Sequence, residues 1–108
     1  WSPGCGSLTE ISYAEELGAE VVKIFPGKQV GGPEFVKAVK GPFPWTSIMP
    51  TGGVSPTREN LKEWFDAGVH CVGIGSNIFI TNEDGSFDYN AITNKLREAI
   101  EIVQDLRK

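Results

Sequence analysis

Short apolar segments that are typical of strands recur along this chain about 25 residues apart. Each is followed by a turn rich in glycine or proline and then by a helical pattern, and we expect the strands at residues 21–25, 45–49 and 71–75. Strands that alternate with helices in this way form parallel β/α units, because the helix carries the chain back to the start of the next strand. The sequence therefore predicts the α/β class with a parallel sheet.

Cap signals mark where the intervening helices begin and end. Ser7 and Glu10 have the spacing of a capping box, Pro33 suits the first turn of the next helix, and Ser55-Pro56 is expected to cap the third. Glycines are expected to end these helices at Gly18, Gly41 and Gly68. After a polar loop at 82–86, apolar residues recur at helical spacing at Ile92, Leu96, Ala99, Val103 and Leu106.

The length of 108 residues limits how these units can assemble. A closed barrel of eight β/α units typically needs about 250 residues, so about three units cannot close one. The chain also starts at Trp1 without a methionine, and Pro3-Gly4 looks like a strand exit without its strand. We therefore expect residues 1–108 to be a single partial domain, the C-terminal part of a TIM (β/α)8 barrel with its N-terminal half absent. An independent three-stranded α/β sandwich is the alternative.

Composition argues against several classes of function. The formal net charge is −4 and no basic run is present, so we expect no nucleic-acid partner. No apolar stretch approaches the length of a transmembrane helix and no signal peptide opens the chain, so we expect no membrane partner and a cytoplasmic location. Cys5 and Cys71 lack metal-ligand spacing and are too few for a disulfide scaffold, so we expect no metal site.

A lysine stands in the middle of the first apolar strand, in the sequence VVKIFPG. Side chains alternate across a strand, so Lys23 shares a face with Phe25, and we expect Ile48 of the next strand to line the same face. In a barrel this is the interior face, and Lys23 lies near the C-terminal end of its strand, where active sites are found. A desolvated amine there can attack a carbonyl and form a Schiff base. The alternatives are a lysine that extends to solvent from an edge strand and, as a weaker nucleophile, Lys28 in the loop beyond.

Two glycine-rich segments follow the other predicted strands: PTGGVSP at residues 50–56 and GIGSNIF at residues 73–79. Glycines let backbone N–H groups approach an anion closely, and the start of a helix favours negative charge. The loops after the seventh and eighth strands of such barrels are a recurrent phosphate site. Each segment taken alone also fits a plain turn, but two of them beside an interior lysine favour an anion site.

Five segments together resemble the C-terminal half of the KDPG/KHG aldolases: PGC (3–5), VVKIFP (21–26), GGPEFVKAVKGPFP (31–44), MPTGGVSP (49–56) and VGIGSNIF (72–79). This resemblance covers essentially the whole chain, and the sequence GSLTE at residues 6–10, where the family often has Thr-Pro, is a local departure from it. The resemblance implies that Lys23 is the Schiff-base nucleophile and that Phe25 walls the keto-acid pocket. It also implies which residues hold the carboxylate or phosphate end of the substrate: Thr51, Gly52, Gly53, Gly75 and Ser76.

The resemblance further implies a class I lyase that needs no cofactor, binds a small-molecule keto acid and forms a homo-oligomer, a trimer in this family. Its substrates are 2-keto-3-deoxy-6-phosphogluconate, cleaved to pyruvate and glyceraldehyde 3-phosphate, and 4-hydroxy-2-oxoglutarate, cleaved to pyruvate and glyoxylate. The general base and the keto-acid arginine of the family belong to its N-terminal half, so we expect the isolated chain to be inactive. A non-catalytic phosphate-binding half-barrel and a sugar-phosphate isomerase fragment are the alternatives.

Overall fold

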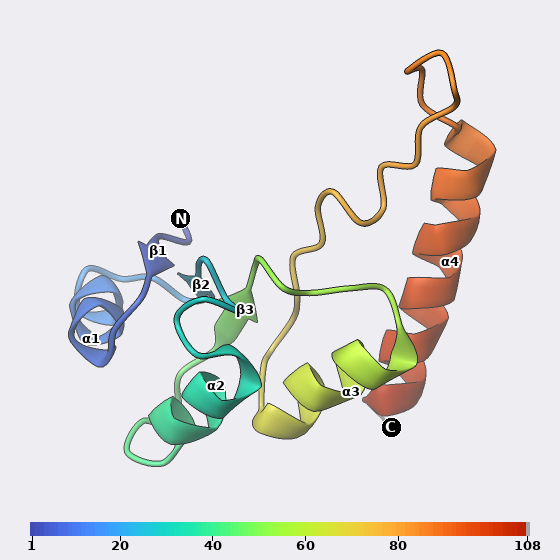
Figure 1. Ribbon diagram of the computed structural model, residues 1–108. Helices are drawn as coiled ribbons and strands as arrows, with labels where there is room; N and C mark the ends of the chain where they lie inside the picture. Colours follow the sequence, from blue (N-terminus) through green and yellow to red (C-terminus); the bar gives the residue numbers. More distant parts are fainter. Residues whose placement is uncertain (108) are drawn as a thin grey trace.

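The computed structural model describes residues 1–107 and has helices and strands in alternation until its last helix. The elements in chain order are β1 (Gly4–Cys5), α1 (Leu8–Glu16), β2 (Val22–Ile24), α2 (Gly32–Lys40), β3 (Ile48–Pro50), α3 (Arg58–Ala67) and α4 (Tyr89–Leu106) (Figure 1). The three strands form one parallel sheet in the order β1-β2-β3. The α/β class with a parallel sheet is thus confirmed, whereas its assignment to part of a TIM barrel stays a prediction.

The two faces of the sheet have different surroundings. Val22 pairs with Ile48 in the parallel register and both are buried, because they face the helices. Lys23 pairs with Met49 on the opposite face, where both are only half-buried. The expectation that Ile48 shares the face of Lys23 is therefore wrong: the register between β2 and β3 sets Ile48 opposite Val22 and Met49 opposite Lys23.

The predicted strand at 71–75 is reduced to a single parallel bridge between Gly73 and Thr51. The His70 N–H still donates to the Ile48 carbonyl (2.9 Å) and the Gly73 N–H to the Pro50 carbonyl (2.9 Å), so this segment runs beside β3 without forming a regular strand. Glycines weaken strands, since they have no side chain to pack and lose more entropy on ordering. Residues 4–5, expected to be a strand exit only, instead form β1.

The first three helices pack on the buried face of the sheet and begin at side-chain caps or at proline. Ser7 caps α1 as expected, and Pro33 lies in the first turn of α2. The cap of α3 is Thr57, whose Oγ1 accepts from the Asn60 N–H (3.3 Å), and not Ser55-Pro56, because Ser55 is engaged in the preceding turn. The shared core contains Cys5, Ile11, Ala14, Ala19, Val22, Ile24, Val36, Val39, Ile48, Val54, Leu61, Trp64, Ala67 and Val69.

Helix α4 lies apart from the sheet and packs against α3 (Figure 1). Arg58 of α3 pairs with Asp105 near its end (2.8 Å), whereas the start of the helix and the turn before it extend away from the other helices (Figure 1). The apolar stripe predicted for this helix is therefore only partly covered: Ala99 is buried, but Leu96 remains 42% exposed. Among the described residues, no helix is long and apolar enough to cross a membrane.

Candidate active site

The loops that leave β2 and β3 contact each other at the C-terminal end of the sheet. The Gly27 N–H donates to the Thr51 carbonyl (2.7 Å) and the Lys28 N–H to the Gly52 carbonyl (3.0 Å). Gly27 has to be a glycine here, because a Cβ would come within 2.7 Å of the Gly52 oxygen. The close contact fixes the glycine segment after β3 next to the strand that carries Lys23.

Lys23 projects from the middle of β2 on the face opposite the helices. Its neighbour across β1 is Gly4, which has no side chain and has open space where a Cβ would be. The ammonium lies 5.3 Å from the centroid of the Phe25 ring, on which a cation is favoured, and that ring is itself 54% exposed. Within residues 1–107, the Lys23 side chain forms no ion pair or hydrogen bond. The amine is thus held at an open face with no competing partner.

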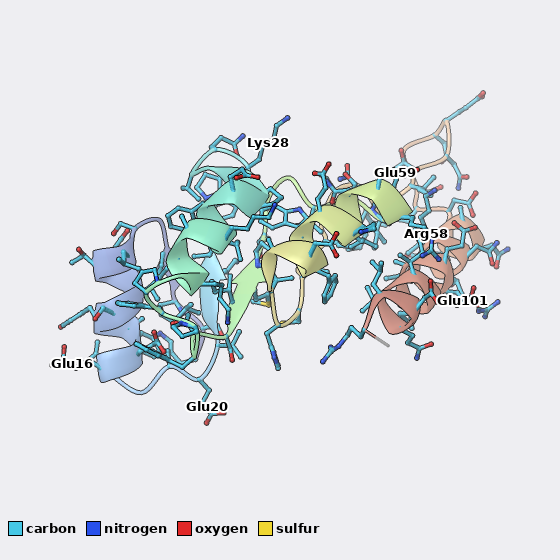
Figure 2. The ribbon with its side chains drawn as sticks, turned by 90° about the horizontal axis from the view of Figure 1, so that it is seen from below. Glu16, Glu20, Lys28, Arg58, Glu59 and Glu101 are labelled. Carbon is cyan, nitrogen blue, oxygen red and sulfur yellow. The ribbon has the colours of Figure 1, made fainter. Side chains whose placement is uncertain are left out.

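Lys28, the other candidate nucleophile, is placed differently. Figure 2 shows its side chain pointing away from the body of the molecule, and the residue is exposed. Its backbone, and not its amine, takes part in the site, through the hydrogen bond to Gly52. Its amine therefore lies outside the site, and Lys23 is the better placed of the two lysines.

The first glycine turn (residues 51–55) has a conformation that requires glycine. Gly52 and Gly53 have φ values of 90° and 80°, in the left-handed region that other residues rarely adopt. A Cβ on Gly53 would also lie 2.5 Å from the Cβ of Lys28. The turn is tied to α3, because the Gly53 carbonyl accepts from the Asn60 amide (3.1 Å) and from the Trp64 indole (3.4 Å).

The second glycine turn (residues 75–78) lies beside the first. Asn77 donates from Nδ2 to the Val54 carbonyl (3.1 Å) and to the Ser55 hydroxyl (3.1 Å), which joins the two turns. Gly75 has nothing within 4 Å of the position of a Cβ, and Ser76 is exposed, so the space in front of this turn is open. Among the described residues, the backbone N–H groups of Gly53, Gly75 and Ser76 donate no hydrogen bond and are available to an anion.

The structure therefore brings the predicted site residues to one end of the sheet, and it adds two that the sequence reasoning missed. Asn60 and Asn77 hold the glycine turns by side-chain hydrogen bonds. Their positions within or just after the glycine segments are a weak signal, because asparagine is common in ordinary turns. Only the folded contacts show that Asn60 reaches back from α3 into the first turn and that Asn77 reaches the first turn from the second.

Glu10 and the two cysteines, the other titratable groups near the strands, are poorly suited to catalysis in this site. The Glu10 carboxylate, which follows β1, accepts from the Gly6 N–H (3.0 Å) and the Ser7 hydroxyl (3.1 Å) in the cap of α1. Burial raises the pKa of the Cys5 and Cys71 thiols, which makes them poor nucleophiles at neutral pH. Among residues 1–107, no three His, Cys, Asp or Glu side chains gather where they could hold a metal ion.

The loops after β2 and β3 and the second glycine turn lack the charged groups that would complete acid–base chemistry. Residues 25–31, 51–57 and 74–80 contain no Asp, Glu or Arg. A general base has to lie within hydrogen-bond reach of the proton that it removes. Together with Lys23 of β2, these three segments can thus supply a nucleophile and backbone N–H donors but no carboxylate.

Residues 1–95 match the family model described as KDPG and KHG aldolase. Among curated proteins, the chain is 42% identical over 78 residues to the 2-dehydro-3-deoxy-6-phosphogalactonate aldolase of Escherichia coli K12, covering 71% of this chain and 37% of that one. It is 33% identical over 100 residues to the KHG/KDPG aldolase of the same organism, covering 92% of this chain and 46% of the relative. The chain thus spans less than half the length of these relatives.

Solved structures show the same likeness. A structure titled "Native KDPGal structure" superposes with a TM-score of 0.82 at 30% identity, covering 97% of this chain and 48% of that one. The 2-keto-3-deoxy-6-phosphogluconate aldolase of Zymomonas mobilis superposes with a TM-score of 0.76 at 26% identity, covering 91% of this chain and 45% of that one. The likeness extends over almost all of the described elements.

Proposed function

Because the chain belongs to the KDPG and KHG aldolase family, we propose that it carries the Schiff-base lysine and the anion-binding turns of a class I aldolase. The observation that carries this proposal is the place of Lys23: its amine is unpaired among the described residues, lies on the open face of the sheet and has the two glycine turns at the same strand ends. Lyase activity is the property of the family, and the role of each residue is our proposal.

In the proposed reaction, the amine of Lys23 attacks the keto carbon of a 2-keto acid, and with the uptake of one proton water leaves to give an iminium ion. A general base removes the proton of the C4 hydroxyl, the C3–C4 bond breaks, and its electron pair passes into the iminium, which gives an enamine and releases an aldehyde from the far part of the substrate. Protonation of the enamine and addition of water then release pyruvate and restore Lys23. The Phe25 ring, beside the amine, would form an apolar wall for the keto acid.

We assign binding of the anionic end of the substrate, the end away from the keto carbon, to the two glycine turns. Free N–H groups of Gly53, Gly75 and Ser76 lie on turns joined by Asn77, and the open space at Gly75 leaves room for an anion to approach. Thr51, which begins the first turn and is bridged to Gly73, is proposed to add its hydroxyl. The substrate we propose is a 2-keto-3-deoxy-6-phospho sugar acid, the class that the names of the relatives share, with 4-hydroxy-2-oxoglutarate as its unphosphorylated counterpart.

The general base and the keto-acid arginine are proposed to come from other strands of the complete enzyme, since the strand exits here contain neither. We expect the 108 residues alone to be inactive as an aldolase, although Lys23 still forms an imine with pyruvate slowly. We also propose that the enzyme works as a homo-oligomer, a trimer as in the family.

Aldol cleavage by the complete enzyme tests this proposal. Lys23→Ala and Lys23→Arg should both reduce pyruvate release from 2-keto-3-deoxy-6-phosphogluconate by more than about a thousandfold, because neither side chain offers a nucleophilic amine. Lys28→Arg is the matched control, since it changes a lysine of the adjacent loop and should leave the rate within about twofold. Activity that survives in Lys23→Arg would rule out the Schiff-base role.

A further inference from the structure

Asn77 is the side chain that joins the two glycine turns. Its Nδ2 atom donates to the Val54 carbonyl (3.1 Å) and to the Ser55 hydroxyl (3.1 Å), although it belongs to a segment more than twenty positions further along the chain. Val54 is almost fully buried, so this carbonyl has no easy alternative partner in water. Both bonds run from the second turn into the first.

The first turn is a rigid support for this contact. Asn60 of α3 accepts from the Ser55 N–H (2.7 Å) and donates to the Gly53 carbonyl (3.1 Å), so one side chain clamps both ends of the turn. The Trp64 indole adds a third bond to the same carbonyl (3.4 Å). Because the first turn is fixed to α3, the bonds of Asn77 join the middle of the second turn to a fixed support.

Apart from Asn77, the second turn is attached within residues 1–107 only at its two ends: the Gly73 N–H, two residues before it, donates to the Pro50 carbonyl (2.9 Å), and Ile78 is buried. Its internal bond runs from the Ile78 N–H to the Gly75 carbonyl (3.0 Å), which shapes the turn but does not attach it. Gly75 has no neighbour within 4 Å of a Cβ position. Ile78 is buried and anchors the end of the turn, whereas Gly75 and Ser76, which carry the free N–H groups, are exposed and directly precede Asn77.

We propose that Asn77 is a positioning residue that sets the spacing between the two glycine turns, and that this spacing makes the site selective for a phosphate. The proposal rests on the anion role assigned to these turns above. A phosphate has oxygens that point in several directions and can bind N–H groups of both turns at once, whereas a carboxylate has two oxygens in one plane and needs one turn only. Loss of the Asn77 hydrogen bonds should therefore weaken phosphate binding more than it slows imine formation at Lys23.

The test compares inorganic phosphate binding with imine formation in the same protein. Phosphate affinity is measured by phosphorus NMR, and imine formation by borohydride trapping with pyruvate. Asn77→Ala should raise the Kd for phosphate about tenfold, the effect expected from losing positioning hydrogen bonds, and should leave trapping at Lys23 unchanged. Asn82→Ala is the matched control, because Asn82 donates a similar bond to the Ser86 hydroxyl (3.1 Å) outside the site; it should change neither quantity.

Each result decides the proposal. An unchanged phosphate Kd in Asn77→Ala overturns it, and so does an equal loss of phosphate binding and trapping, which would mean a general structural role. Wild-type protein that is trapped by pyruvate but binds no phosphate overturns this inference and leaves the Schiff-base proposal standing; phosphate binding without trapping does the reverse. If circular dichroism shows that Asn77→Ala is unfolded, Ser55→Ala removes only one of the two acceptors and should raise the Kd about threefold.

Discussion

The glycines of the candidate site do two different jobs. Gly53 needs its left-handed backbone and would clash with Lys28 if it carried a Cβ, so any substitution there strains the fold. Gly75 has no positive φ and has free space around a Cβ. A substitution at Gly75 therefore changes what a ligand meets without straining the turn.

This difference selects Gly75 for a clean charge test. Gly75→Asp places a carboxylate in front of the free N–H groups. It should lower kcat/KM for phosphorylated substrates by about tenfold or more, because the carboxylate repels the phosphate. Gly75→Asn has nearly the same shape without the charge and should cost much less. Steady-state kinetics with phosphorylated and unphosphorylated keto acids provides the measurement, and equal losses for both substrates would refute the anion assignment.

At the level of single residues, the sequence predicts the residues that bind or react better than the residues that hold them in place. Lys23 and the glycines could be found because strand alternation and glycine-rich exits are local patterns. The roles of Asn60 and Asn77 could not: Asn60 reaches back from α3 into the turn before it, and Asn77 reaches a turn more than twenty positions away. The side of the sheet on which Ile48 lies was predicted wrongly, because the register between two strands is not encoded in either strand alone and a change of one residue exchanges the two faces.

Among the elements, helix α1 has the clearest link between local sequence and stability. The Ser7 hydroxyl accepts from the Glu10 N–H (3.2 Å), and the Glu10 carboxylate accepts from the Gly6 N–H (3.0 Å), so both sides of the capping box are formed. The helix follows β1 directly and contributes Ile11 and Ala14 to the core. Its start therefore holds an edge of the sheet in place.

Ser7→Ala should lower the free energy of unfolding by about 1 kcal/mol, because the Glu10 N–H loses its acceptor. Ser12→Ala is the control on the same helix. Ser12 lies in the middle of the helix and is exposed to solvent, so alanine there should be neutral or slightly stabilising. Urea denaturation followed by circular dichroism measures both. Equal destabilisation by the two substitutions would mean that the cap contributes nothing specific.

Helix positions followed from the sequence more closely than strand positions, for a physical reason. Caps and helical spacing are encoded within a few residues, and they locate the four helices to within a few positions. A strand depends on its neighbours in the sheet: residues 71–75 have β3 on one side only, and among the described residues no strand pairs with their other side. The expected strand is consequently reduced to one bridge.

The molecule as a whole is more extended than a compact domain of its length. Its radius of gyration is 14.9 Å, compared with about 13 Å expected for this number of residues. The difference comes from α4, whose start and preceding turn lie far from the sheet (Figure 1). Three aromatic side chains there contact one another and remain exposed to water: Phe79, Phe87 and Tyr89.

Exposed apolar surface of this kind favours association. We expect the chain to show a mass above that of one chain in light scattering, increasing with protein concentration. Ile100→Lys, at a position of α4 that is 56% exposed, should reduce this association, whereas Thr93→Lys, an exposed polar position on the same helix, should not. A constant monomer mass at all concentrations would contradict this prediction and show that the exposed apolar surface does not drive association.

The central claim is that Lys23 forms a Schiff base with a 2-keto acid, and covalent trapping tests it most directly. The protein is incubated with pyruvate and borohydride, digested, and mapped by mass spectrometry. We predict a pyruvate-derived mass increase on the peptide that carries Lys23, no increase without pyruvate, and none in Lys23→Arg. Trapping at Lys28 instead, or no trapping in a folded protein, would contradict the account.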